Sequence, residues 1–213
     1  MPKILTPDEI LSFRNRMCDH ALVSFGKHGV EGISLRGLAA DLSCSRTTPY
    51  RYFKDKADIL AALRQREFGR IANTLEAVLL QETDTSKQLE ALFRAYIQFA
   101  IQYPDSYRVM YNVAQPDSAQ YTELKAEIFR SGEPIRLVVN TAVEAGTMFG
   151  DPVNNCYVLW AGLHGLISLH LANLIGDKRD IEELAGVMIQ ALILSVSTDT
   201  SEIAAAGQKI ELS

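Results

Sequence analysis

Apolar residues recur at intervals of three and four along most of the chain. This spacing places them on one face of a helix, and runs of β-branched residues that would indicate strands are absent. The segments with this spacing are separated by residues that begin or end helices. The sequence therefore predicts an all-α protein.

The first predicted helix begins after Thr6 and ends near Lys27. Thr6 can cap it, Pro7 suits its first position, and Glu9 can complete a capping box. Its apolar stripe consists of Ile10, Met17, Ala21 and Phe25. A turn at residues 29–32 then leads into the next predicted helix.

Two short helices are predicted between residues 34 and 56. Ser34 caps the first, whose apolar positions are Leu35, Leu38, Ala39 and Leu42. Ser43 and Cys44 make a tight turn, Ser45 offers a second cap, and Phe53 is expected to anchor the second helix. That helix is rich in groups that bind phosphates and base edges, namely Arg46, Thr47, Thr48, Tyr50, Arg51 and Tyr52. This pattern predicts a helix-turn-helix whose second helix lies in the major groove of DNA.

The remainder of the chain also has helical spacing. A long helix opens at residues 54–58 and ends near residue 81. Further helices are predicted at about 86–103, around 107–111, at 124–145, at 153–175 and at 180–196. Gly132 and Pro134 predict an interruption or kink in the third of these. The polar, Ala-rich residues from Ser197 onward are expected to be loosely held.

Charge is distributed unevenly along the chain. The net charge is −5. Residues 1–56 carry nine Lys and Arg against six Asp and Glu, a balance of +3, which leaves twelve against twenty, or −8, for the remainder. A modestly basic N-terminal segment followed by an acidic remainder suits a protein with one DNA-binding face.

Cysteine usage and hydropathy indicate the cytoplasm. The three cysteines are odd in number and scattered, which favours a reducing compartment over a disulfide framework. The N-terminus has no apolar run of signal-peptide length. The most apolar stretch, residues 156–175, contains several polar residues, so it is expected to be a buried interface helix and not a membrane span.

Residues from about 14 to 60 resemble the DNA-binding signature of the tetracycline-repressor-like (TetR) family of transcriptional regulators. The matching positions are Met17, Ala21, Phe25, Gly29, Leu35, Leu38, Ala39, Leu42, Ser45, Thr48, Tyr50, Arg51, Phe53, Lys56 and Leu60. Two positions depart from it, because Ser43 replaces a Gly and Pro49 replaces a Leu. Ser43 is expected to adopt a left-handed conformation. Pro49 should bias Thr48 away from helix and leave a short, tightly wound reading helix.

The resemblance implies three parts of the chain. These are a three-helix helix-turn-helix DNA-binding domain at 1–56, a helical ligand-binding and dimerisation domain at 57–200, and a loosely ordered tail at 201–213. The expected DNA contacts are Arg36, Ser45, Arg46, Thr47, Thr48, Tyr50, Arg51, Tyr52 and Lys56. Lys56 and the first amides of the long helix suit a phosphate, because the helix dipole favours an anion there.

In the second domain, Trp160, His164 and Gly165 resemble the Trp-His-Gly element of one subgroup of the family. Trp160 and His164 are one turn apart and share a helix face, whereas Gly162 and Gly165 allow another backbone to come close. The family implies a small-molecule pocket, for which the candidate lining residues are Phe99, Tyr103, Tyr107, Met110, Tyr111, Phe129, Trp160 and His164. Core packing is the alternative for this aromatic set, and a hydrogen-bonded structural role is the alternative for His164.

The function predicted from these features is sequence-specific transcriptional regulation. The resemblance implies a homodimer formed by the last two helices, and a repressor released from a palindromic operator by an unknown small molecule. No cofactor or metal is expected, and the alternative is a ligand-independent or partner-controlled DNA-binding regulator. An enzyme is disfavoured because no phosphate loop or nucleophile elbow is present and because Cys156 and His164 would be roughly 12 Å apart on one helix.

Overall fold

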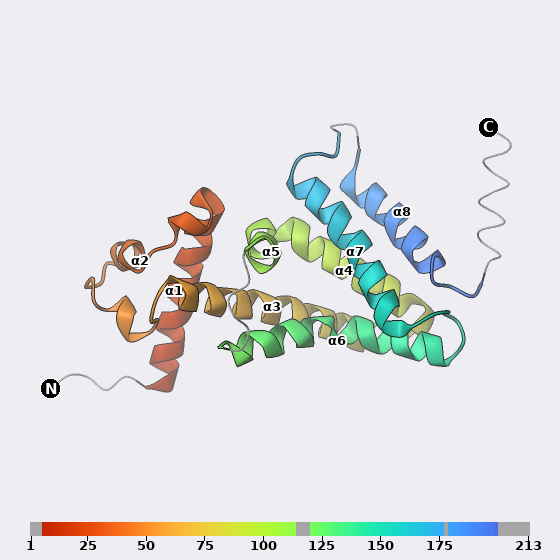
Figure 1. Ribbon diagram of the computed structural model, residues 1–213, viewed down its shortest axis with the longest axis horizontal. Helices are drawn as coiled ribbons and strands as arrows, with labels where there is room; N and C mark the ends of the chain where they lie inside the picture. The colour runs from red at the N-terminus through yellow and green to blue at the C-terminus, as the bar shows by residue number, and fades with distance from the viewer. Residues whose placement is uncertain (1–5, 114–119, 177–178, 200–213) are drawn as a thin grey trace. The chain divides into compact units, whose positions relative to one another are not determined.

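The computed structural model describes residues 6–113, 120–176 and 179–199, and the regular elements in these ranges are helical (Figure 1). The predicted all-α class is confirmed. In chain order the elements are α1 (Pro7–His28), the 3-10 helix η1 (Val30–Gly32), α2 (Leu35–Asp41), the 3-10 helix η2 (Pro49–Arg51), α3 (Lys56–Gln81), α4 (Thr85–Gln102), α5 (Pro104–Tyr111), α6 (Thr122–Glu144), α7 (Pro152–Leu171) and α8 (Ile181–Leu194). None of the helices in the described ranges combines the length and the apolar character that a membrane span requires.

The chain divides into two compact units that each combine two stretches of sequence. The first unit comprises Met1–Arg70 and Tyr103–Phe129, and the second comprises Ile71–Gln102 and Arg130–Ser213. The predicted DNA-binding segment 1–56 lies within the first unit. This unit also includes the whole of α5, which packs against α1, and the first parts of α3 and α6. The predicted boundaries at 56 and 200 stay predictions, and the tail at 201–213 lies outside the described residues.

The start of α1 has the predicted capping box. The backbone N–H of Glu9 donates to Thr6 Oγ1 at 3.2 Å, and the backbone N–H of Thr6 donates to Glu9 Oε2 at 2.9 Å. Met17, Ala21 and Phe25 are buried as predicted. The prediction for Ile10 was wrong, since its side chain is 39% exposed. Ile10 lies in the first turn of α1, and the buried residues of this helix begin at Met17.

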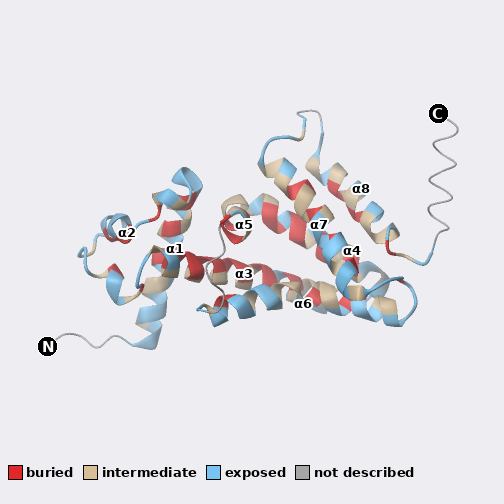
Figure 2. Cartoon of the chain, in the orientation of Figure 1, coloured by how far each residue is buried: buried red, intermediate tan, exposed pale blue. Residues whose placement is uncertain are grey.

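The core of the first unit is assembled from both of its sequence stretches (Figure 2). The long helix α3 contributes Ile59, Leu60 and Leu63, and α5 with the residues that follow it contributes Val109 and Val113. The remaining buried members are Met17, Cys18, Ala21, Phe25, Ile33, Leu35, Leu38 and Phe53. Because each buried aliphatic side chain stabilises the fold by about 1.5–3 kcal/mol, the two valines stabilise the helix-turn-helix from outside its own sequence.

The second unit is built from α4, α7, α8 and parts of α3 and α6. Helix α7 packs against both α4 and α8. Asp151 caps α7 by accepting from the backbone N–H of Asn154 at 2.9 Å, and Pro152 begins the helix, as predicted. Gly162 lies against α8, since a Cβ at this position would be 2.6 Å from Leu192 Cδ2. The predicted approach of another backbone is not seen at either glycine in the described residues, because the neighbour of Gly162 is the Leu192 side chain and a Cβ at Gly165 would meet nothing within 4 Å.

Helix α6 continues through the predicted interruption. It runs unbroken from Thr122 to Glu144 with Pro134 inside it. A proline inside a helix removes one hydrogen bond, yet here the ring is buried and Val138 and Val139 of the following turn are also buried. Burial of this face compensates for the lost bond. The last two helices end at Leu171 and Leu194, a few residues before the predicted ends.

Candidate nucleic-acid interface

The interface begins at α2, where local sequence determines the geometry. Ser34 caps α2, because its hydroxyl accepts from the backbone N–H of Gly37 at 3.0 Å. Leu35, Leu38 and Ala39 are buried. The helix consequently turns its opposite face outward, and Arg36 is exposed on that face.

Ser43 has the left-handed conformation that its position in the turn requires. Its φ is +50°, in the region that glycine adopts without cost. The backbone N–H of Ser43 donates to the carbonyl of Ala40, and that of Cys44 donates to the carbonyl of Ala39, both at 3.0 Å. The prediction for Ser43 is therefore confirmed. The turn is closed by backbone hydrogen bonds despite the absence of glycine.

The segment Ser45–Tyr52, which we call the reading segment, is wound more tightly than an ordinary recognition helix. It consists of a turn followed by η2 at Pro49–Arg51. The predicted cap at Ser45 was wrong, because its hydroxyl contacts the hydroxyls of Thr47 and Thr48 at 3.1 and 2.8 Å. The predicted bias of Thr48 was also wrong, since its φ of −59° and ψ of −47° are helical. The hydroxyl cluster and the bond from Thr48 N to Ser45 O, at 2.9 Å, stabilise this turn.

The reading segment presents most of the predicted DNA contacts to solvent. Thr48, Tyr52 and Lys56 are half-buried, and the exposed members are Arg36, Ser45, Arg46, Thr47, Tyr50 and Arg51. Pro49 and Phe53 are buried beneath them. The predicted anchoring role of Phe53 is confirmed. The segment therefore has one packed side and one polar side rich in hydrogen-bond donors.

Two residues of α1 that the sequence analysis did not select hold the reading segment. Arg14 donates a hydrogen bond from Nη1 to the carbonyl of Tyr52, and its guanidinium lies 4.2 Å from the centre of the Phe53 ring. Phe13 stacks on Tyr52 with ring centres 4.4 Å apart. Phe13 precedes Met17 by four residues, which was a signal that it lies on the buried face of α1.

Lys56 has a partner within the protein. Its Nζ lies 3.1 Å from Glu31 Oε2, and the Glu31 side chain is 93% exposed. An exposed pair of this kind contributes about 0–1 kcal/mol, so a phosphate can replace the carboxylate at little cost. Asp58 accepts from the backbone N–H of Lys54, and Asp55 accepts from that of Asp58, both at 2.9 Å. These carboxylates disfavour an anion at the first amides of α3. The Lys56 ammonium is therefore the better hydrogen-bond donor to a phosphate.

A buried ionic cluster ties α1, α3 and α5 together. Glu67 is fully buried and lies 2.8 Å from Arg66 Nη2 and 2.7 Å from Arg70 Nη1. Arg66 also lies 2.6 Å from Asp19 of α1. The fully buried Arg64 donates to the carbonyl of Met110 at 3.0 Å. Sequence reasoning missed this cluster, because charged side chains on a helix are usually exposed and nothing in the local sequence shows that Arg64 and Glu67 are buried.

The eight candidate ligand-pocket residues fall into different units. The first unit contains Tyr103, Tyr107, Met110, Tyr111 and Phe129, and the second contains Phe99, Trp160 and His164. Phe99, Tyr107 and Met110 are buried, whereas Phe129 is 64% exposed. The rings of Tyr107 and Tyr111 have centres 4.8 Å apart, and Arg70 lies 4.3 Å from the centre of the Tyr103 ring. These contacts form an aromatic cluster on α5.

Trp160 and His164 share a face of α7 as predicted. Their ring centres are 5.4 Å apart, and Trp160 Nε1 donates to the hydroxyl of Tyr96 at 2.9 Å. Burial lowers the pKa of His164, which keeps the ring neutral at neutral pH. Tyr96 is a polar partner that the sequence analysis did not identify. The pair is thus part of a small polar contact between α4 and α7.

Two models of protein families match the chain. Residues 18–63 match the model described as bacterial regulatory proteins of the tetR family, and residues 89–192 match the model of the tetracyclin repressor-like C-terminal domain. An uncharacterised HTH-type transcriptional regulator of Mycobacterium tuberculosis is 31% identical over 97 residues, which are 45% of this chain and 41% of that protein. The match thus spans about two fifths of that relative. An HTH-type transcriptional regulator of Mycobacterium bovis is 27% identical over 178 residues, covering 68% of this chain and 74% of the relative.

Solved structures share the fold over most of the chain. A protein of unknown function from a Rhodococcus species is 25% identical, with a TM-score of 0.76 over 87% of this chain and 95% of that one. The fatty acid degradation regulator FadR from Bacillus halodurans is 17% identical, with a TM-score of 0.70 over 90% and 97% of the two chains. At this identity the second likeness concerns the fold alone.

Proposed function

Because this chain belongs to the tetracycline-repressor-like (TetR) family of transcriptional regulators, we propose that it is a repressor that binds a palindromic operator as a homodimer. A small molecule bound to the helical C-terminal part releases it. That the chain is a DNA-binding regulator follows from its family. The operator, the dimer and the effector are parts of the proposal.

The observation that carries the proposal is the construction of the reading segment. Arg46, Thr47 and Tyr50 are exposed above the buried Phe53. Arginine reads guanine through two parallel hydrogen bonds, and hydroxyl groups bind phosphates or base edges. Because Arg14 and Phe13 hold this segment on α1, its side chains are presented in one orientation. An oriented set of donors is what sequence-specific binding requires.

The apolar surface of the last two helices supports a homodimer. On α7, Val153, Tyr157 and Leu169 are 59, 65 and 49% exposed, and on α8 Val187 is 63% exposed. Helices this apolar rarely leave such surface uncovered, and a second copy is the partner that the family implies. Two copies would supply two reading segments for the two halves of a palindrome.

Release by a small molecule requires that the molecule bind one of two conformations more tightly. The ion pairs around Glu67 join α3 to α1, and the buried Arg64 joins α3 to the carbonyl of Met110 on α5, so a change in α5 would act on the helix that holds the reading segment. The aromatic cluster on α5, with Tyr107 and Tyr111, supports this part of the proposal. The other candidate residues stay predictions.

The deciding experiment is a salt series of fluorescence anisotropy titrations. It uses the purified protein with duplex DNA from immediately upstream of its gene and an unrelated duplex as control. We expect tight binding to the first duplex alone, a steep loss of affinity with salt, and saturation at one dimer per palindrome. Equal weak binding to both duplexes would place the operator elsewhere. Failure to bind any duplex at low salt would contradict the proposal.

The alternative of a ligand-independent regulator has one observation in its favour. Phe99, Tyr107 and Met110 are buried against their neighbours, as core residues are. A thermal-shift screen separates the two possibilities, because a ligand that binds the folded state raises its melting temperature. A regulator without an effector would show no stabilising compound.

A further inference from the structure

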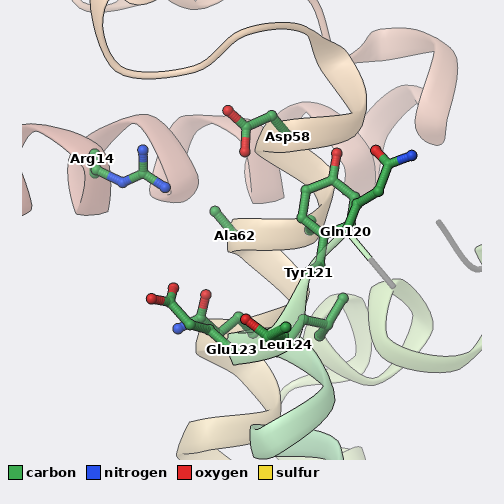
Figure 3. Close-up of a pocket in the computed structure, with 10 residues that line it drawn as sticks. Arg14, Asp58, Ala62, Gln120, Tyr121, Glu123 and Leu124 are labelled. Carbon is green, nitrogen blue, oxygen red and sulfur yellow. The ribbon is translucent and has the colours of Figure 1, made fainter. Parts of the chain in front are cut away.

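The first unit contains a hollow of about 300 Å³ among α1, the start of α3 and the start of α6 (Figure 3). We propose that it binds a small zwitterion with an excess of positive charge, the charge pattern of a basic amino acid. None of the eight candidate pocket residues lines it. The hollow is therefore a different site from the aromatic cluster.

The size and floor of the hollow suit one small molecule. Its volume is at the lower end of the range for ligand sites, about 300–1,000 Å³. Ala61 and Ala62 of α3 lie against it, together with the buried Leu124 of α6. The short alanine side chains leave the space open. A methylene chain can lie against these apolar side chains.

The charges around the hollow specify the ligand. Figure 3 shows the guanidinium of Arg14 on one side and the carboxylates of Asp58 and Glu123 on two others. One cation and two carboxylates are matched by a molecule with one carboxylate and two cationic groups, each an ammonium or a guanidinium. A basic amino acid has these groups, and charge-assisted hydrogen bonds are the strong ones. A simple anion would face two carboxylates, and a diamine would leave Arg14 opposite a cation.

The lining groups retain capacity for a ligand. In the described part of the chain, the Glu123 carboxylate has no hydrogen bond or ion pair, whereas Asp58 uses one oxygen for the backbone N–H of Lys54. Partial burial and the negative charges of Asp55 and Asp58 raise the pKa of the Tyr121 phenol. The phenol therefore remains a hydrogen-bond donor. The same carboxylates create the negative field that attracts an ammonium group.

The site shares two residues with the supports of the reading segment. Arg14 donates to the carbonyl of Tyr52, and Asp58 accepts from the backbone N–H of Lys54. A ligand that binds Arg14 and Asp58 would compete with these contacts or strengthen them. This step rests on the proposed function, and it makes the ligand an effector of operator affinity.

The first test is calorimetry on the full chain without DNA, with L-lysine, L-ornithine and L-arginine as probes. L-norleucine, which lacks the side-chain ammonium of lysine, is the matched control ligand. We expect saturable binding of at least one basic amino acid at one site per chain, with no binding of L-norleucine. Glu123→Gln should weaken that binding roughly tenfold or more, because it removes a charged acceptor. Ala62→Leu should abolish it by filling the hollow.

The matched control variant is Glu144→Gln, which removes an exposed carboxylate at the other end of α6. It should bind the ligand as the wild type does. Circular dichroism melts verify that each variant folds. Absence of binding by all three probes, or equal binding by wild type and Glu123→Gln, would overturn the site.

A second measurement isolates the coupling. Operator affinity is measured with and without the bound amino acid, for the wild type and for Glu123→Gln. A change of affinity in the wild type alone supports the effector role, and no change in either overturns that role. A protein that binds operator but no amino acid contradicts only the site. A protein that binds an amino acid but no DNA contradicts only the proposed function.

Discussion

Arg14 of α1 donates a hydrogen bond to the backbone carbonyl of Tyr52, at the end of the reading segment. The same guanidinium lies over the ring of Phe53, so one side chain contacts both the backbone and the buried anchor of that segment. Arg14 and Tyr52 are 38 positions apart in the chain. This contact determines how the reading segment is held on α1.

Replacing Arg14 should therefore affect both stability and DNA binding. We expect Arg14→Met, which keeps the apolar stem, to destabilise the protein by about 1–3 kcal/mol, because a part-buried carbonyl loses a charged donor. Operator affinity should fall as well, because the reading segment is less constrained. Urea unfolding and anisotropy titration measure the two effects. Lys27→Met, at an exposed basic residue in the last turn of α1, is the control, and an equal effect of both variants would contradict the role of Arg14.

Arg46 is the residue expected to read a base. Arg46→Ala should weaken operator binding by about 1–3 kcal/mol and relax specificity at one position in each half-site. Titrations against operators altered at single positions measure both effects. Arg94→Ala is the control, since Arg94 is paired with Glu90 on α4. Unchanged base preference in Arg46→Ala would exclude this assignment.

Replacing either member of the pair formed by Lys56 and Glu31 should change DNA affinity, and the two replacements should act in opposite directions. Lys56→Ala should weaken binding to all sequences alike and reduce the salt slope by about 1. Glu31→Gln should tighten binding, because the Lys56 ammonium no longer has a competing carboxylate. A double-mutant cycle over a salt series measures both. Identical slopes for the wild type and Lys56→Ala would show that Lys56 does not contact a phosphate.

The buried Cys18 should make the stability of the protein depend on pH in the alkaline range. Burial raises the pKa of its thiol to about 11, from 9.0 in an exposed thiol. The folded state therefore retains a proton that the unfolded state loses, and stability that is fully present below pH 9 is lost as pH rises to about 11. Because protonation and folding are linked, the free energy of unfolding should fall by about 2–3 kcal/mol. Chemical denaturation below and above this range should show the loss in the wild type and a smaller one in Cys18→Ala. The half-buried Cys44 offers the control Cys44→Ala, which should retain the full loss.

The dimer proposal predicts the effect of a charge on α8. Val187→Glu should shift the protein from dimer to monomer, because a carboxylate would be buried in an apolar interface. Sedimentation velocity measures the change. Leu80→Glu is the control, because Leu80 is 83% exposed on α3 and belongs to neither of the last two helices. If the Val187→Glu variant stays dimeric, the interface lies elsewhere.

Features that depend on neighbouring residues could be predicted from the sequence. The caps at Thr6, Ser34 and Asp151 each join groups three residues apart, so they form whenever the helix forms. Ser43 adopts the left-handed conformation because the tight turn between two helices requires it. The exposed donors of the reading segment were also identified, since one side of that segment is apolar and the other polar.

Features in which packing or a cluster of side chains outweighs a local preference were missed or predicted wrongly. An interruption or kink was expected at the proline in α6, but Pro134 is buried and the helix continues without interruption. Ser45 was expected to cap a helix, but its hydroxyl joins those of Thr47 and Thr48. In both places the local preference is worth only a few kcal/mol, and packing or a cluster of side chains exceeds it.

The sequence by itself determined the helical class, most helix boundaries, the helix-turn-helix and the family. These follow from periodicity, caps and a motif, all of which act over a few residues. Only the tertiary structure decided that α5 completes the core of the DNA-binding unit, that Arg14 holds Tyr52, and that Asp58 and Glu123 face one hollow. The physical reason is that these contacts join residues tens of positions apart. Their formation depends on how whole helices pack, which no local pattern specifies.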